Sequence, residues 1–173
     1  MKYRRVKIKG GAYFFTVVTH QRSPIFSSEQ NIKILKESFK CVMVDRPFVI
    51  DAYVILPDHM HCIWTLPKGD SDYSTRWRII KGFFTHEFFN GSSVKGEKQT
   101  IWQKRFWEHA IRNEEDFIKH ADYIHYNPVK HGYAEKALYW RHSSLAKFLQ
   151  NKSYQSDWDE GRLRSLDNLN ISD

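Results

Sequence analysis

The segment FVIDAYVILPDHMHCIWTL, residues 48–66, contains two runs of β-branched and aromatic residues that meet at Pro57-Asp58. Runs of this composition favour strands, and Pro-Asp is a typical turn signal. We therefore predict strands at 48–56 and 59–66 that pair as a hairpin.

Hydrophobic periodicity on both sides of this hairpin predicts the remaining elements. Strands are expected at 12–19 and 101–112, and helices at 28–44, at about 74–89, and from Asn113 to a stop at Pro128. This order predicts an α+β sandwich of ferredoxin-like, RRM-like type, with a mostly antiparallel sheet and helices on one face. We expect one domain over residues 1–150 and a mildly acidic, loosely ordered tail over 151–173.

The charge of the chain is basic and unevenly distributed. Twenty-seven Lys and Arg against twenty Asp and Glu give a net charge of +7, and the tail at 151–173 carries −2 of the total. A basic body favours a polyanionic partner, because phosphate contacts release counterions; ordinary solubility charge is the competing explanation. No apolar run approaches the roughly 18 residues that span a bilayer, so we expect a cytoplasmic protein without a membrane partner.

Two histidines interrupt the second strand of the hairpin. Residues two apart in a strand point to the same face, so His59 and His61 lie side by side, whereas Met60 and Cys62 face the other way. Two neutral imidazoles at this spacing can share a divalent metal. A pair of this kind is also common as a structural feature, and a functional site needs further groups.

The helix after Asn113 offers such groups. Phe117, Ala121 and Ile124 recur with helical spacing and should face the core. A second stripe runs beside them and consists of Asp116, His120, Tyr123 and Asn127. Tyr123 and Asn127 are one turn apart at the border of the apolar face, where a side chain is held by packing and still reaches a cleft. An amphipathic boundary tyrosine and a helix-capping asparagine are the alternative interpretations.

Three blocks give these residues a shared context: LPDHMHCIW (56–64), IWQKRFWEHAIR (101–112) and DYIHYNPVKHG (122–132). Together they resemble the single-tyrosine transposases of the HUH nuclease superfamily, named for a His-hydrophobic-His motif. Among these, the chain is most similar to the repeat-associated (REP-associated) tyrosine transposases, which are linked to repetitive extragenic palindromes in bacterial genomes. The resemblance spans about residues 3–150.

The resemblance implies a catalytic mechanism. His59, His61 and Asn127 would bind Mg²⁺ or Mn²⁺, and Tyr123 would attack single-stranded DNA at palindromic hairpins, leaving a 5′-phosphotyrosine and a free 3′-hydroxyl. Insertion-sequence relatives usually carry Gln where Asn127 stands. A phenol has an ordinary pKa of about 10 and needs help to react at neutral pH; His120 is a possible helper. Both a monomer and a homodimer remain open.

Basic residues provide candidate DNA contacts, which are Arg4, Arg5, Arg76, Arg78, Lys81, Lys104 and Arg105. A solvated arm at the N-terminus and an ordinary charged helix face are the competing interpretations. Two other functions also remain open at this point. One is a non-catalytic, RRM-like nucleic-acid-binding module, and the other is a metal phosphoesterase that uses activated water.

Overall fold

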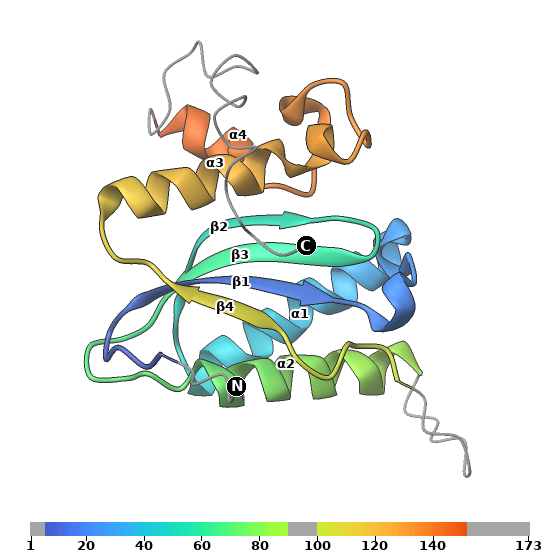
Figure 1. Cartoon of the computed structure of the whole chain (residues 1–173). Coiled ribbons are helices and arrows are strands. Elements are labelled where there is room, and N and C mark those ends of the chain that lie inside the picture. The colour runs from blue at the N-terminus through green and yellow to red at the C-terminus, as the bar shows by residue number, and fades with distance from the viewer. Residues whose placement is uncertain (1–5, 90–99, 152–173) are drawn as a thin grey trace.

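The computed structural model describes residues 6–89 and 100–151, and in it a four-stranded sheet lies between two layers of helices (Figure 1). In chain order the strands and α-helices are β1 (Ala12–Val18), α1 (Glu29–Asp45), β2 (Val49–Ile55), β3 (His59–Thr65), α2 (Tyr73–Phe88), β4 (Trp107–Ala110), α3 (Glu114–Lys130) and α4 (Leu145–Gln150). Short 3₁₀ turns are η1 (His20–Arg22), η2 (Ile25–Ser27) and η3 (Ala137–Tyr139).

The sheet has the strand order β2-β3-β1-β4, and every neighbouring pair is antiparallel. The predicted hairpin is confirmed as β2 and β3. With α1 and α2 as the connecting helices, this order is that of a ferredoxin-like βαββαβ unit. The α+β class and the antiparallel sheet predicted from the sequence are therefore confirmed.

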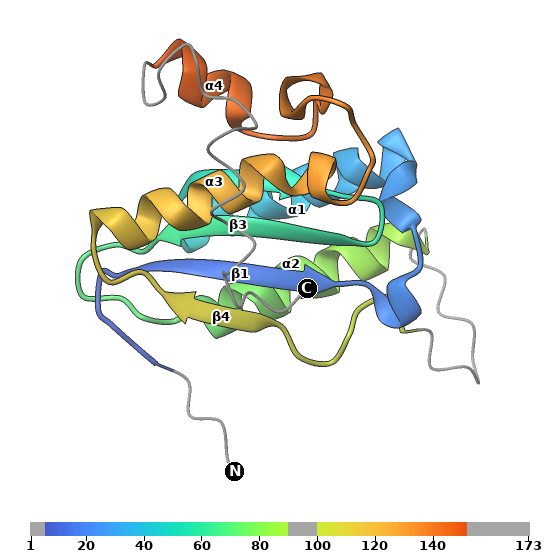
Figure 2. The same ribbon diagram turned by 45° about the horizontal axis from the view of Figure 1, so that its top comes forward.

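Helices cover both faces of the sheet, as Figure 2 also shows. The first two helices, α1 and α2, pack on one face, where Phe15, Trp64 and Trp77 belong to the larger core cluster. The third, α3, packs on the opposite face with Phe14 and Ile63. The prediction of helices on one face is thus correct for α1 and α2 and wrong for α3. The reason is that strand β1 is apolar on both of its faces, so each face needs a cover.

Two predicted boundaries are wrong. The strand predicted at 101–112 is regular only at Trp107–Ala110, apart from a single bridge between Trp102 and Thr19. Pro128 lies inside α3, which continues to Lys130. The helix is terminated just after Lys130 by Gly132, whose φ of +70° allows its N–H to bond the carbonyl of Val129 while the N–H of Tyr133 bonds that of Pro128.

The C-terminal elements pack against the outer side of α3. His125 Nε2 lies 2.8 Å from Ser144 Oγ, and α4 and η3 lie over the same helix (Figure 2). No helix within 6–89 or 100–151 has the length and apolar character needed to cross a membrane. The N-terminal Arg4 and Arg5, residues 90–99 and all of the predicted tail at 151–173 except its first residue lie outside the described residues.

Candidate active site

Strand β3 presents His59 and His61 to α3, and both side chains are fully buried. Each imidazole is held through Nδ1. Thr16 Oγ1 lies 2.9 Å from Nδ1 of His61, and Asp58 Oδ1 lies 2.6 Å from Nδ1 of His59. An ionised carboxylate accepts from Nδ1–H, so Asp58 sets the tautomer of His59 and leaves Nε2 as the nitrogen suited to a metal, whereas the Thr16 hydroxyl, which can donate or accept, orients the ring of His61.

Helix α3 brings Tyr123 and Asn127 to the same place. The rings of Tyr123 and His61 meet edge to face, with centroids 5.3 Å apart, and those of His61 and His59 are 5.0 Å apart. Asn127 is fully buried. His59, His61 and Tyr123 therefore lie together on one face of the sheet, within a single chain, and Asn127 is buried one turn after Tyr123 on the helix that covers this face.

The polar atoms in this cluster fit a divalent cation. Among the described residues, Nε2 of His59 and both amide atoms of Asn127 are buried and have no hydrogen-bond partner. Burying polar atoms in this way costs free energy unless a ligand compensates for the lost contact with water. Two imidazole nitrogens and an amide oxygen form a mixed donor set that accepts Mn²⁺ readily and Mg²⁺ with the help of further oxygens.

Lys130 contacts the hydroxyl group of Tyr123. Its ammonium nitrogen lies 3.2 Å from the phenolic oxygen and 4.8 Å from the centre of the ring. His120, which the sequence suggested as a helper, instead places Nδ1 2.7 Å from the backbone carbonyl of Asp116. Lys130 is two helical turns after Tyr123, so a count along the helix face could have found it.

Asp58 joins the site to the turn before β3. Its carboxylate accepts a hydrogen bond of 2.9 Å from Arg22 and pairs with His59 through its other oxygen. Burial by itself raises the pKa of this carboxyl, but the hydrogen bonds to His59 and Arg22 outweigh burial and hold the pKa below its ordinary value. Asp58 therefore stays ionised and fixes the ring of His59, a role that sequence reasoning missed because it treated Asp58 only as a turn residue.

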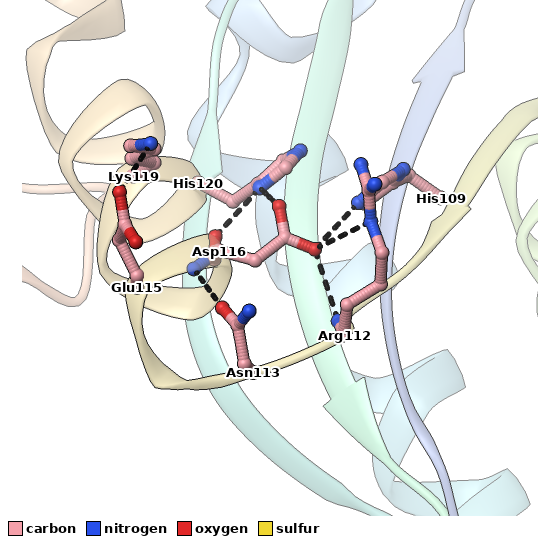
Figure 3. Close-up of polar contacts among 7 residues, drawn as sticks. All are labelled: His109, Arg112, Asn113, Glu115, Asp116, Lys119 and His120. Atoms are coloured by element: carbon pink, nitrogen blue, oxygen red, sulfur yellow. Dashed lines mark hydrogen bonds and ion pairs between the residues drawn. The ribbon is translucent and has the colours of Figure 1, made fainter.

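A second polar cluster lies where β4 meets the start of α3 (Figure 3). His109, Asp116 and His120 have ligand atoms within 4.8 Å of one another, a spacing compatible with a cation. The two imidazoles are however stacked, with centroids 4.6 Å apart and an angle of 14° between them. A shared ion should lie near the plane of both rings, which stacked parallel rings do not allow.

The cluster acts instead as a link between strand and helix. Asp116 accepts a hydrogen bond from the backbone N–H of Arg112 and lies 2.8 Å from His109 Nε2. Burial by itself raises the pKa of Asp116, but the hydrogen bonds to His109 and to the Arg112 amide outweigh it and hold the pKa below its usual range. A carboxylate in the first turn of α3 also interacts favourably with the helix dipole.

The predicted DNA contacts are placed very differently from one another. Arg76 is buried and donates hydrogen bonds to Asp70 and to the carbonyl of Pro47, so its prediction as a DNA contact is wrong. Arg78, Lys104 and Arg105 are exposed. Lys81 lies over the rings of Trp102 and Phe106. All of these residues belong to α2 or to the segment before β4, away from the face that carries Tyr123.

The fold and the buried His-x-His pair opposite a helix tyrosine define the class of protein. Residues 7–127 match the family described as "Transposase IS200 like", and the chain belongs to this family of transposases. It is therefore an enzyme of the single-tyrosine transposase type.

Individual relatives narrow this class. The chain is 48% identical to the REP-associated tyrosine transposase of Escherichia coli strain K12, over 91% of this chain and 90% of that one. A Haemophilus influenzae protein described as a "Putative REP-associated tyrosine transposase" is 40% identical, over 90% of this chain and 92% of that one. A solved structure of a REP-associated tyrosine transposase bound to a REP hairpin is 47% identical and superposes with a TM-score of 0.80, covering 91% of this chain and 90% of the other.

Proposed function

We propose that this transposase cleaves and rejoins single-stranded DNA at palindromic repeat hairpins through a covalent bond to Tyr123. The observation that carries the proposal is the contact of the Tyr123 ring with His61, in a site that also buries His59 and Asn127. The relative solved with a REP hairpin supports hairpin DNA as the substrate. A cytoplasmic location remains a prediction.

The chemistry of the proposed step is a transesterification at phosphorus. The phenolic oxygen of Tyr123 forms a bond to the phosphorus, the bond from phosphorus to the 3′-oxygen breaks, and the proton lost by the phenol is balanced by one gained at the new 3′-hydroxyl. The covalent link keeps the energy of the phosphodiester. A second 3′-hydroxyl can therefore reverse the step and join two strands.

His59, His61 and Asn127 would hold a divalent ion, Mg²⁺ or Mn²⁺. When bound, such an ion neutralises charge on the phosphate and favours attack on the phosphorus. The protein itself contributes the orientation of its ligands, through Thr16 and Asp58. Asn127 offers the same amide oxygen as the Gln usual in insertion-sequence relatives, on a shorter arm.

Lys130 is the group that would assist Tyr123. An ammonium 3.2 Å from the phenolic oxygen stabilises the phenolate over the phenol, and so favours the nucleophilic form. The exposed Arg78, Lys104 and Arg105 would contact the hairpin backbone at a distance from the cleavage site.

The test is incubation of the protein with a 3′-labelled DNA hairpin that carries unpaired flanks, in Mg²⁺ or Mn²⁺. We expect a labelled protein adduct that survives denaturation, is lost in Tyr123→Phe and is lost with chelator. Cleavage that persists in Tyr123→Phe without an adduct would indicate attack by activated water. Hairpin binding by the wild type, without cleavage in either metal, would favour the non-catalytic binding module.

A further inference from the structure

A cavity of about 390 Å³ lies near the turn that precedes β3, and its lining includes none of the proposed catalytic or metal-binding residues. Its walls come from η2, the start of α1 and the segment at 139–142, and Pro57 forms part of its lining. Pro57 directly precedes Asp58 and His59. The cavity therefore lies close to the start of β3, where His59 is, and its volume suits a small organic group.

A series of aromatic rings connects the two places. The ring of His131 lies 5.2 Å from that of His59, Tyr133 stacks on His131 at 5.9 Å, and Trp140 lies 5.8 Å from Tyr133. Tyr133 is 43% exposed. The series of rings therefore joins the proposed metal ligand His59 to the wall of the cavity, and Tyr133 is the member whose ring surface a DNA strand can contact.

The wall at 139–142 is held in place. Trp140 donates its indole N–H to the carbonyl of Ile55 at 2.9 Å, and the backbone N–H of Ile55 donates to the carbonyl of His142 at 2.8 Å. Both bonds join the segment to the end of β2. The cavity is thus formed before any ligand arrives, which reduces the entropy cost of binding.

The cavity combines an aromatic surface with a polar edge. Tyr139 is 66% exposed, which is unusual for so large a ring, and the ammonium of Lys136 lies 5.9 Å from its centre. Glu29, which also lines the cavity, pairs with Arg141 and lies 2.9 Å from His142 Nε2. A flat ring beside adjacent acceptor and donor groups matches a nucleobase, which has a stacking face and an edge of donors and acceptors.

We propose that this cavity holds one unpaired base of the DNA substrate, stacked on Tyr139, with its edge against Glu29 and Arg141. The proposal rests on the proposed function, because it takes single-stranded DNA as the ligand. The pocket fixes one base, and through it the register of the strand relative to Tyr123. It therefore contributes to the choice of the phosphate that is cleaved.

The test uses a repetitive-palindrome hairpin with unpaired flanks in which 2-aminopurine replaces one flanking base at a time. Binding is measured on Tyr123→Phe protein, so that no cleavage occurs. We expect strong fluorescence quenching at one flanking position, loss of that quenching in the added change Tyr139→Ala, and a roughly tenfold or greater loss of affinity. The matched control is Leu138→Ala, a neighbouring residue that is 57% exposed and does not line the cavity.

A hairpin without unpaired flanks should bind equally well to the Tyr139→Ala and control proteins. Quenching at no position, or equal affinity of Tyr139→Ala and control for the flanked hairpin, would overturn the proposal. Adduct formation by protein with an intact Tyr123 then separates the two proposals. If the adduct forms and Tyr139→Ala does not affect it, the proposed function is supported and the base pocket is contradicted. If binding depends on Tyr139 but no adduct forms, the pocket is supported as a single-strand binding site and the proposed cleavage function is contradicted.

Discussion

The two faces of the sheet are built from alternate residues of the same strands, yet they differ in chemistry. Toward α1 and α2, strand β3 presents Met60, Cys62 and Trp64, which enter an aromatic core. Toward α3 it presents His59 and His61 together with Ile63. The side chains that β3 presents to the first face are apolar or aromatic, whereas those that it presents to the second include two buried imidazoles.

This difference assigns folding stability mainly to the face under α1 and α2, and the candidate active site to the face under α3. Trp64 lies 4.4 Å from the stacked ring of Trp77, and close packing of this kind supplies much of the free energy of folding. The α3 face carries polar atoms whose burial costs free energy. We infer that the aromatic face compensates for the cost of the α3 face, and substitutions on either side can test this.

The largest effect is expected from His61→Ala on the α3 face. Loss of this proposed metal ligand should lower the rate of hairpin cleavage by about 10³-fold or more, because a bound ion would supply several kcal/mol of transition-state stabilisation. The free energy of unfolding should change by less than about 1.5 kcal/mol, since no large apolar side chain is lost. Cleavage kinetics and urea unfolding on the same preparation measure both quantities. A much larger fall in the free energy of unfolding of His61→Ala, measured in the absence of metal, would show that His61 is mainly structural.

On the opposite face, Trp64→Ala should reverse this pattern. Removing a fully buried indole that packs against Trp77 and Phe48 should lower the free energy of unfolding by about 3–5 kcal/mol. Protein that remains folded at low temperature should still cleave, since the indole does not touch the site. Active-site titration by adduct formation gives the rate per folded molecule. A large loss of that rate would mean that the two faces are coupled.

A smaller effect on activity is expected from Lys130→Met. The substitution removes the ammonium beside the Tyr123 hydroxyl and keeps most of the apolar stem. Cleavage at neutral pH should slow by roughly 10²-fold, and the deficit should shrink as pH rises, because hydroxide then forms the phenolate without assistance. Lys130→Arg, which keeps the charge, should recover part of the rate. A deficit that is the same at every pH would assign Lys130 to packing or DNA binding.

The smallest effect is expected from Asp116→Asn, at the polar link between β4 and α3. The folded state holds the pKa of Asp116 below its ordinary value, so the ionised carboxylate stabilises the fold above the unfolded pKa and loses this effect as pH falls through the folded one. The variant should be about 1 kcal/mol less stable at pH 7. Its difference from the wild type should decrease below about pH 4. Unfolding curves at both pH values test this.

Much of the site was visible in local patterns. The two-residue repeat of a strand placed His59 and His61 on one face, and the spacing of a helix aligned Tyr123 with Asn127. The order of elements predicted an antiparallel sheet in an α+β fold. These features depend on geometry that repeats within one element, so they can be read without knowing how elements pack.

Other features depended on contacts between distant segments. The placement of α3 on the face opposite α1 and α2 depends on long-range packing. The contact of Tyr123 with His61 likewise joins residues that are far apart in the chain. Arg76 also shows the effect of tertiary packing. Its charge predicted a DNA contact, but its burial in the folded protein excludes one. The sequence by itself thus determined the order of the main strands and helices and four residues of the candidate site, His59, His61, Tyr123 and Asn127. Only the tertiary structure decided which groups meet, because burial and long-range packing are properties of the whole chain.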